Sequence, residues 1–525
     1  MHLFLTPLRP EPAAHGGHFF SRYRPHSGVA RARLLAELFV AACCVSQVPG
    51  SRPALAATKI SPTMTTPLTR RTFLKTTTAA SALAFPAVLR SQPPGTPSPN
   101  NRLNVAIIGA AGRGGAAVEG VRKENIVAIC DVDEERGRGA VKTLKTRFPD
   151  EGDSAVSAEH FDDYRKMFDK LGSKIDAVTV SIPDHMHFPA AMTAMGLGKH
   201  VYVEKPLAHT VWETRELTRL AREKKVITQM GNQGHTHDGT RLLKEWVEAG
   251  VLGEVREVVS WTNRPFYPPW REPVGSFKKP DHSKFIPVVP KSLNWDAWLG
   301  VAATRPYDPA YMPGLKWRGW WDFGTGAFGD VACHIMDGAY WALNLGAPTS
   351  VEAMSTQATD VACPLASIVT NHFPARGSMP PVKYTWSDGG LIPPLPKELE
   401  FGRDLPAEAG TLLFGSKCTV LCSFYYETVR IIPEMKMKEF APSLPAKTIP
   451  RVQGGPFTEW LAGIKGGPTP GSNFAYSGPF TESVLLANVA IRSRRRIEWD
   501  TKTMKVTNVP DANQFITKEY RPGWM

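Results

Sequence analysis

Short apolar segments alternate with helical patterns along the middle of the chain. The segments 103–108 (LNVAII), 126–130 (IVAIC) and 175–182 (IDAVTVSI) have the length and the β-branched residues of buried strands. Alternating strands and helices are typical of a parallel sheet whose ligands bind at the carboxyl ends of the strands. The same pattern continues with predicted elements at 188–196 (helix), 199–203 (strand), 211–224 (helix) and 226–230 (strand).

A different pattern begins after residue 230. A helix is predicted over 241–249, and 255–261 (VREVVSW) has the apolar spacing of a strand. We therefore expect an α/β domain with a doubly wound parallel sheet, a Rossmann fold, over 101–230, and a second domain over 231–525. Further short strands of the second domain are predicted at 411–414, 419–424 and 428–432.

The first hundred residues have the features of a targeting region. The segment 69–90 (TRRTFLKTTTAASALAFPAVLR) places two arginines before an uncharged, moderately apolar stretch with a small-residue site, Ala-Leu-Ala. This is the pattern of a twin-arginine signal peptide, and the stretch is too short and too rich in threonine for a stable membrane span. We expect 64–100 to contain this signal and a Pro/Ser linker, and 1–63 to be a mis-started or unstructured extension. The twin-arginine translocase would then export the folded protein to the periplasm.

Charge and cysteine content bear on two classes of function. The net charge of +13 would suit a nucleic-acid-binding protein, but residues 1–100 carry 11 of the 62 basic and 2 of the 49 acidic residues. The remaining chain is nearly balanced, so we expect no nucleic-acid partner. Seven cysteines without a CxxC pair or a zinc spacing do not form a disulfide scaffold, and we interpret those beyond the N-terminal region as buried thiols.

The first predicted strand leads into a glycine-rich turn, 109–115 (GAAGRGG), and the second ends in a carboxylate, Asp131. Strand, glycine-rich turn, helix and strand-end carboxylate form the fingerprint of a dinucleotide-binding domain. Small residues let the backbone approach a pyrophosphate, and amides at the helix start donate hydrogen bonds to it. The middle glycine of G-x-G-x-x-G is Ala111 here, which fits if the turn shifts onto Gly112. The predicted cofactor contacts in this region are Gly109, Ala111, Gly112, Arg113, Gly114 and Asp131.

Asp131 also bears on the choice of cofactor. Its carboxylate would accept hydrogen bonds from the adenosine ribose and would repel a 2′-phosphate, which favours NAD over NADP. Arg113 in the turn would still reach a phosphate, so NADP stays open as the second choice.

The segment 177–208 (AVTVSIPDHMHFPAAMTAMGLGKHVYVEKPLA) contains Pro-Asp-His-Met-His at 183–187 and Glu-Lys-Pro at 204–206. It resembles the core of the Gfo/Idh/MocA oxidoreductase family, of which the Glu-Lys-Pro tripeptide is the most specific mark. The resemblance runs from about residue 102 to the C-terminus, and it is closest to exported members with twin-arginine signals. It extends the expected cofactor contacts to Pro183, His187, Glu204, Lys205 and Gln233.

The resemblance also implies a second-domain fold and a catalytic set. Family members have a C-terminal α+β domain with a large open, mainly antiparallel sheet that meets the nicotinamide cleft. Asp330 and His334, at i, i+4 in a predicted helix, are similar to the family's Asp-x-x-x-His, and with Lys205 they form the catalytic set. A carboxylate at this spacing would orient the imidazole and raise its pKa, so that His334 acts as a general base. Without the resemblance, a lone Asp-x-x-x-His is more often a surface ion pair or a core histidine.

Within Glu-Lys-Pro each residue has an expected role. Glu204 is expected to orient Lys205 and to balance its charge. Pro206 is expected to fix the backbone, through a cis peptide bond as in relatives.

The segment 295–337 contains five tryptophans together with Arg318. Aromatic rings stack on the C–H face of a polyol while polar groups bond to its hydroxyls, so we expect one or two of these tryptophans to contact substrate. Core packing between the domains is the alternative for any single tryptophan. The predicted substrate contacts are Arg318, Trp320, Trp321 and Asp337.

Two histidine pairs raise the question of a metal site, His185 with His187 and His235 with His237. Such a pair holds zinc only with a third ligand and with supporting hydrogen bonds. We therefore expect no metal, and we interpret the imidazoles of 183–187 as hydrogen-bond donors beside the nicotinamide.

Together these features predict an NAD-dependent oxidoreductase that transfers a hydride from a hydroxyl-bearing carbon of a sugar, cyclitol or glycoside. Because an exported enzyme has no free NAD pool, we expect the cofactor to stay bound and to be recycled. A redox-neutral glycosidase, lyase or epimerase acting through a transient keto sugar is the alternative, and a non-catalytic periplasmic sugar-binding protein is the third reading. As in relatives, we expect a homodimer or homotetramer, and the aromatic tail 511–525 (DANQFITKEYRPGWM) is expected to pack on a neighbour.

Overall fold

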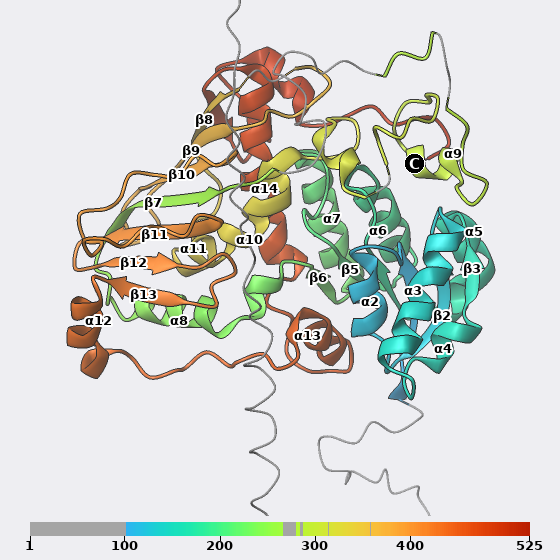
Figure 1. Ribbon diagram of the computed structural model, residues 1–525, viewed down its shortest axis with the longest axis horizontal. Helices are drawn as coiled ribbons and strands as arrows, with labels where there is room; N and C mark the ends of the chain where they lie inside the picture. The colour runs from blue at the N-terminus through green and yellow to red at the C-terminus, as the bar shows by residue number, and fades with distance from the viewer. Residues whose placement is uncertain (1–100, 266–279, 284–286, 313, 357–358, 525) are drawn as a thin grey trace, which may run out of the picture. The chain divides into compact units, whose positions relative to one another are not determined.

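The computed structural model describes residues 101–265, 280–283, 287–312, 314–356 and 359–524, which build two sheets with helices around them (Figure 1). The predicted extension 1–63 and the predicted signal and linker 64–100 lie outside these residues. Among the helices of the described ranges, none combines the length and the hydropathy that crossing a membrane requires.

A six-stranded parallel sheet, with strand order β3-β2-β1-β4-β5-β6, forms the first domain (Figure 1). Its strand β4 (Ala177–Val180) is buried at every position, as expected where helices cover both faces of a sheet. Strand β1 lies in the middle of this sheet, and the later strands extend from it to each edge in turn, so the predicted Rossmann fold is confirmed. The other strands are β1 (Asn104–Ile108), β2 (Asn125–Cys130), β3 (Glu159–Phe161), β5 (His200–Val203) and β6 (Thr228–Met230).

Helices cover both faces of the parallel sheet. They are α2 (Gly114–Gly120), α3 (Glu134–Arg147), α4 (Asp153–Ser157), α5 (Tyr164–Leu171), α6 (His187–Gly196) and α7 (Val211–Lys224). Successive residues of a strand point to opposite faces, and β1 shows the result. Its Val105 and Ile107 belong to one hydrophobic cluster with α2 and α3, whereas Ala106 and Ile108 belong to another with α5, α6 and α7.

The second domain is built on a nine-stranded sheet, with order β13-β12-β11-β7-β10-β9-β8-β14-β15. Neighbouring strands are antiparallel except β7 and β10, so the predicted mainly antiparallel sheet is confirmed. The strands are β7 (Val255–Thr262), β8 (Ser350–Ser355), β9 (Ser367–Phe373), β10 (Val382–Ser387), β11 (Ala409–Gly415), β12 (Thr419–Cys422), β13 (Val429–Ile432), β14 (Ile497–Asp500) and β15 (Lys505–Val506). The helices that accompany them are α8 (Asp238–Glu248), α9 (Trp295–Leu299), α10 (Cys333–Ile335), α11 (Asp337–Ala342) and α12 (Glu434–Phe440).

Two helices from the end of the chain return to the first domain, α13 (Gly455–Ile464) and α14 (Phe474–Ser493). Phe457 of α13 stacks on Tyr202 of β5 with 4.1 Å between ring centroids. Trp460 packs edge-on against the same tyrosine, and α14 packs along α7. The parallel sheet is therefore covered partly by residues that were predicted to belong to the second domain.

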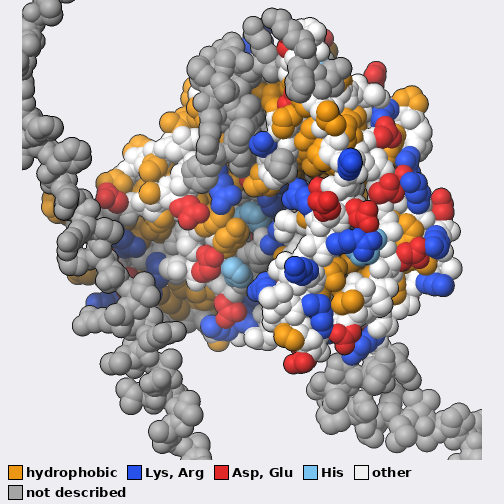
Figure 2. Space-filling model, turned by 45° about the vertical axis from the view of Figure 1, so that its right-hand side comes forward, with side chains coloured by type: hydrophobic (Ala, Val, Ile, Leu, Met, Phe, Trp, Pro, Cys, Tyr) orange, Lys and Arg blue, Asp and Glu red, His pale blue; other side chains and the backbone are white. Residues whose placement is uncertain are grey.

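Charged side chains of both signs are interspersed on the described part of the face shown in Figure 2. Some of them form ion pairs one helical turn apart, such as Arg138 with Glu134 at 2.8 Å and Lys166 with Asp162 at 3.1 Å. Exposed pairs of this kind contribute little to stability, with a median of about 0–1 kcal/mol each. These surface ion pairs therefore contribute little to the free energy that stabilises the fold.

Candidate active site

A cleft of about 530 Å³ lies at the carboxyl edge of the parallel sheet. Its walls come from the glycine-rich turn after β1, the ends of β2, β4 and β5, and the second domain. Its volume is typical of small-molecule and cofactor sites, which measure roughly 300–1,000 Å³. The predicted site residues in its lining are Gly109, Ala111, Gly112, Arg113, Asp131, Pro183, His187, Glu204, Lys205, Gln233, Arg318, Asp330 and His334. The predicted residues outside the lining are Gly114, Trp320, Trp321 and Asp337.

The glycine-rich turn has a backbone that requires its glycines. Gly109 has φ +79°, and a Cβ there would lie 2.3 Å from the carbonyl oxygen of Ser181. Gly112 has φ +59°, so the turn runs through Gly112, as expected from Ala111 at the middle glycine position. Gly114 lies behind the turn: a Cβ there would lie 2.0 Å from Gly109 O, and its amide donates to Ala111 O at 3.0 Å. Gly114 therefore lets α2 approach β1, which corrects its assignment as a cofactor contact.

Asp131 ties this turn to the end of β2. Its Oδ2 accepts hydrogen bonds from the amides of Ala110 at 3.0 Å and Ala111 at 3.2 Å, and its Oδ1 accepts one from Asp133 N at 3.0 Å. Burial raises the pKa of Asp131, while these three amides oppose the rise. A carboxylate has about four acceptor positions, so one remains for a ribose hydroxyl.

The residues of the turn fit a bound dinucleotide. Across the ranges that the structure describes, the backbone amides of Gly112 and Arg113 donate no hydrogen bond, although both residues line the cleft. Such amides suit pyrophosphate oxygens, and the remaining acceptor position of Asp131 suits the ribose. The site therefore has donors and an acceptor where NAD needs them.

Buried charges join the two domains at the end of β5. Lys205 Nζ lies 2.6 Å from Asp330 Oδ1 and also donates to Asp330 O at 2.8 Å. Arg318 lies between two carboxylates, with Nε 3.2 Å from Asp330 Oδ1 and Nη1 3.1 Å from Asp184 Oδ1. Asp184 is fully buried and accepts further hydrogen bonds from Thr325 N at 3.1 Å and Thr325 Oγ1 at 2.6 Å. Buried charges are stable only when paired in this way, so the network fixes the Lys205 ammonium in the cleft.

Asp330 was predicted to orient His334, but the structure does not pair the two side chains. Phe328–Ala332 forms a π-helical turn, wider than an α-helix, so the i, i+4 spacing does not pair the two side chains, and Asp330 bonds to Lys205 instead. The Nδ1 atom of His334 is buried without a hydrogen-bond partner among the described residues, and the ring lies edge-on to Tyr425 at 5.0 Å between centroids. Burial, followed by the charge of Lys205, lowers the pKa of His334 well below its ordinary value. The predicted rise in pKa is therefore wrong, and the imidazole is neutral at pH 7.

Glu204 was predicted to pair with Lys205, but it pairs with Arg113 instead. Arg113 Nε donates to Glu204 Oε1 at 2.9 Å, which ties the glycine-rich turn to the end of β5. The Lys205–Pro206 peptide bond is cis, as predicted. His187 Nδ1 lies 2.7 Å from Pro206 O, so the turn at 183–187 is joined to Glu-Lys-Pro.

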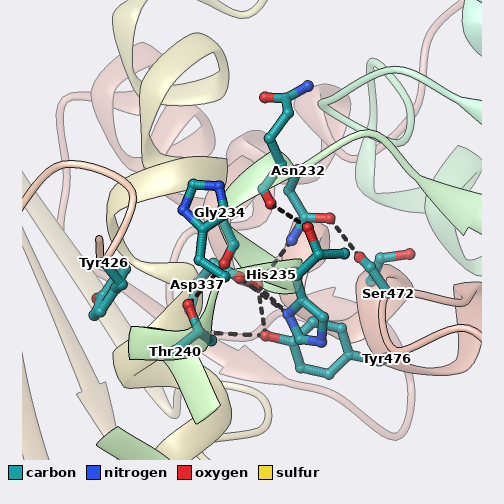
Figure 3. A network of polar contacts seen from close by, with 12 residues as sticks. Asn232, Gly234, His235, Thr240, Asp337, Tyr426, Ser472 and Tyr476 are labelled. Carbon is teal, nitrogen blue, oxygen red and sulfur yellow. Dashed lines mark hydrogen bonds and ion pairs between the residues drawn. The ribbon is translucent and has the colours of Figure 1, made fainter. Parts of the chain in front are cut away.

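Asp337 belongs to a buried polar network instead of a substrate site (Figure 3). Its Oδ1 accepts hydrogen bonds from Asn232 Nδ2 at 2.8 Å and Tyr476 OH at 2.7 Å, and its Oδ2 lies 3.0 Å from His235 Nδ1. The side chain is 1% exposed. The network joins the loop after β6 to α11 and α14, and Gln233 in that loop lines the cleft. The structure therefore contradicts the prediction of Asp337 as a substrate contact, since its side chain is buried and lies outside the cleft lining.

Trp320 and Trp321 are also buried away from the cleft. Their indole N–H groups donate to backbone carbonyls, and both residues pack in the core of the second domain. Trp298 and Trp317 of the same aromatic segment line the cleft instead, together with Tyr425. The segment thus contributes to the cleft wall, but through other tryptophans than the two predicted, because their spacing does not reveal which rings reach the cleft.

The histidine at position 185 also lies outside the cleft lining. His185 Nε2 lies 3.2 Å from the carbonyl oxygens of both Trp298 and Leu299, and burial lowers its pKa to about 3. It is thus bonded to the protein backbone and does not face the cofactor position. Among the described residues, no three His, Cys, Asp or Glu side chains are grouped to hold a metal ion.

The fold and the cleft together define a two-domain oxidoreductase with a dinucleotide-binding Rossmann domain. Residues 103–232 match the family model described as oxidoreductase family, NAD-binding Rossmann fold. Residues 242–390 match the model described as oxidoreductase family, C-terminal alpha/beta domain. The chain belongs to the Gfo/Idh/MocA oxidoreductase family and contains its NAD-binding Rossmann domain.

Curated relatives are similar over parts of their length. A glycosyl hydrolase family 109 protein of Solibacter usitatus is 34% identical over 171 residues, 30% of this chain and 36% of that protein. The dTDP-3,4-didehydro-2,6-dideoxy-alpha-D-glucose 3-reductase of Streptomyces violaceoruber is 34% identical over 82 residues, 16% of this chain and 24% of that protein. Levoglucosan dehydrogenase of Pseudarthrobacter phenanthrenivorans is 28% identical over 93 residues, 18% of this chain and 23% of that protein. The chain thus matches 23% to 36% of these relatives' own lengths.

Solved structures are similar over most of the fold. The WlbA dehydrogenase from Chromobacterium violaceum, in complex with NADH and UDP-GlcNAcA, has a TM-score of 0.50 and 18% identity over 77% of this chain and 98% of that chain. An oxidoreductase domain protein from Kribbella flavida has a TM-score of 0.50 and 18% identity over 76% of this chain and 99% of that chain. At this identity the likeness shows the fold alone.

Proposed function

We propose that this protein is an NAD-dependent oxidoreductase acting on a hydroxyl-bearing carbon of a sugar, cyclitol or glycoside. The observation that carries the proposal is the meeting of Lys205, Asp330 and His334 in the cleft that also contains the glycine-rich turn. Trp298 and Trp317 add aromatic rings that suit the C–H face of a polyol. The names of the relatives, two of them sugar reductases or dehydrogenases, support a carbohydrate substrate.

NAD is proposed over NADP. The support is Asp131, a carboxylate at the end of β2, where it would face the ribose 2′ position. A 2′-phosphate there would meet a like charge. Arg113, the cation of the glycine-rich turn, is already paired with Glu204.

In the oxidation direction, His334 takes the hydroxyl proton at a ring nitrogen while the carbon-bound hydride leaves. Lys205 donates a hydrogen bond to the reacting oxygen and stabilises the negative charge that develops there. Two of its three N–H groups are directed to Asp330, so one remains for substrate. When bound, NAD supplies the carbon that accepts the hydride.

The acid side of the pH profile tests the role of His334. Because burial lowers its pKa well below the ordinary 6.5, the unprotonated base persists as pH falls through that value. We expect kcat/KM for oxidation to stay level as the pH falls through 6.5, and His334→Asn to reduce kcat about 10²- to 10⁴-fold. A wild-type acid limb centred at pH 6.5 would contradict the assignment of His334 as a base with a lowered pKa.

A redox-neutral reaction on the same substrates is the second candidate. The Solibacter usitatus relative is named as a glycosyl hydrolase family 109 protein, and it is 34% identical to this chain over 171 residues. Oxidation at a ring carbon acidifies the neighbouring C–H, so elimination and re-reduction would give glycosidase, lyase or epimerase chemistry. His334 and Lys205 would serve the redox steps of both candidates.

One experiment distinguishes the two candidates and tests retention of the cofactor. The protein is purified from the periplasmic fraction, because the segment 69–90 supports our proposal of export by the twin-arginine pathway. Denaturation is expected to release nicotinamide dinucleotide. Incubation of the loaded enzyme with sugars and glycosides is then followed in the absorbance band of NADH. A lasting NADH signal supports the oxidoreductase, and release of aglycone without that signal supports the redox-neutral enzyme. A protein that releases no NAD on denaturation and binds none when it is supplied would contradict both candidates.

A further inference from the structure

The aromatic tail of the chain packs on its own fold and reaches the cofactor cleft. The sequence predicts that 511–525 packs on a neighbour, but the described residues of this tail contact the first domain and the end of α9 (Figure 1). The family models end at residue 390, so neither describes this tail. Its Trp524 lines the cleft and is 7% exposed.

The tail is held against the start of α7. The amide of Trp212 donates to Ile516 O at 3.0 Å. Lys518 Nζ lies 2.9 Å from Glu213 Oε1, and Tyr520 OH donates to the same oxygen at 2.7 Å. Glu213 is fully buried, so both bonds are shielded from water. These contacts fix the direction in which the last residues run.

Two arginines, Arg165 and Arg521, then fix the position of Trp524. Arg521 donates from Nε to Gly300 O at 2.8 Å. Arg165, at the start of α5, donates to Gly523 O at 2.9 Å, and its guanidinium lies 3.6 Å from the centroid of the Trp524 ring. A cation stacked on an indole at this distance is a favourable contact, so the ring is held in one orientation at the cleft wall.

The location of Trp524 identifies the half of the cofactor that it faces. The pyrophosphate belongs at the turn after β1 and the ribose at Asp131 after β2, so the adenine points toward β3. The cleft lining contains residues 162–164, which follow β3, and Trp524 packs on Arg165 next to them. Lys205 ends β5, four strand positions from β3, or roughly 19 Å at about 4.8 Å per strand. The tryptophan is thus far from the reacting carbon and near the adenosine end.

We propose that Trp524 is a cofactor-binding residue, whose indole, backed by the Arg165 guanidinium, stacks on the adenine of NAD. An aromatic ring at a purine site adds affinity without hydrogen-bond specificity, because every base has a π-face. The tail thereby closes the adenosine end of the cleft with a residue from outside the Rossmann domain. In an enzyme that keeps its NAD through many turnovers, this contact slows cofactor release.

Binding measurements on Trp524→Ala test the assignment without relying on turnover. Calorimetry with NADH, AMP and reduced nicotinamide mononucleotide separates the two halves of the cofactor. We expect Kd for NADH and for AMP to rise about tenfold, as for loss of one base–aromatic stack, and Kd for the mononucleotide to stay unchanged. Trp524→Phe, which keeps an aromatic face, is expected to retain most of the affinity. Unchanged NADH binding, or an equal loss for the mononucleotide, overturns the proposal.

A matched control and a second variant separate stacking from stability. Trp499 is also buried, with 6% of its surface exposed, and the Arg215 guanidinium lies 5.9 Å from the centroid of its ring. Unlike Trp524, it lies outside the cleft lining. Trp499→Leu is expected to leave all three dissociation constants unchanged. If Trp524→Ala does not fold, Trp524→Leu decides, since it keeps apolar volume against Arg165 but removes the aromatic face. Wild-type affinity for AMP in that variant overturns the proposal.

Discussion

Replacing Lys205 by methionine is expected to reduce kcat about 10²- to 10³-fold, the effect of removing one donor to a developing oxyanion. The fold should survive, because Asp330 keeps a second cation, Arg318 Nε at 3.2 Å. The substitution keeps an unbranched side chain, one atom shorter, and removes its charge. Steady-state kinetics with added NAD measure kcat of the variant and of the wild type, and a titration with NADH measures Kd for both.

Lys244 provides the matched control for this variant. Its side chain is 14% exposed, close to the 12% of Lys205, and it pairs with Glu248 at 3.0 Å in α8, outside the cleft. Lys244→Met is expected to keep wild-type kcat. If Lys205→Met lost NADH affinity in proportion to kcat, its role would be to hold the cofactor and not to stabilise charge on the substrate oxygen.

Arg318→Leu is expected to destabilise the protein by about 3–5 kcal/mol, the usual cost of breaking a buried ion pair from one side. The guanidinium lies between Asp184 and Asp330, whose side chains are nearly inaccessible. Removing it leaves Asp184 with Thr325 as its remaining donor among the bonds described above. Urea unfolding followed by far-UV circular dichroism measures the loss in free energy of unfolding.

Two further variants test this explanation. Arg305, 15% exposed, pairs with Asp322, which is 42% exposed, so Arg305→Leu is expected to cost below about 1 kcal/mol. The double variant Arg318→Leu with Asp184→Leu removes both charges of one pair and is expected to regain part of the lost stability. Equal stability losses for Arg318→Leu and Arg305→Leu would refute a special role of the buried network.

The parts of the fold predicted from sequence are those with local causes. The strand–turn–helix pattern around Gly109 and Gly112 is written in consecutive residues, because positive φ angles and close backbone approach both demand glycine there. Helix α7 (Val211–Lys224) was predicted with its observed bounds, and its capping box of Thr210 and Glu213 is likewise local. The Glu-Lys-Pro motif brought Lys205 to the carboxyl edge for the same reason: it directly follows a strand.

Partners across the chain were not predictable from spacing. Glu204 pairs with Arg113, 91 residues away, and Lys205 pairs with Asp330, 125 residues away. Asp330 and His334 would share one face of an α-helix, but the π-helical turn at Phe328–Ala332 changes that register. No residue pattern before the turn indicates it.

The substrate contacts show a second limit. Trp320 and Trp321 come from a short irregular segment, where periodicity does not define which side faces a cleft. Asp337 is buried because Asn232 and His235 of one loop and the distant Tyr476 of α14 converge on it. The aromatic segment was found by its composition, whereas the orientation of each ring depends on tertiary packing.

The return of α13 to the parallel sheet has a consequence for synthesis of the protein. Trp460 donates to Ile227 O in the first domain across 233 residues of sequence. Tyr202 therefore stays uncovered on the emerging chain until α13 leaves the ribosome, so the Rossmann domain cannot be completed while the second domain is being translated. Long-range contacts of this kind slow folding and prolong exposure of apolar surface to chaperones. The two domains of this protein are distinct in architecture, but the first is completed by a helix that follows the second domain's main sheet strands in the sequence.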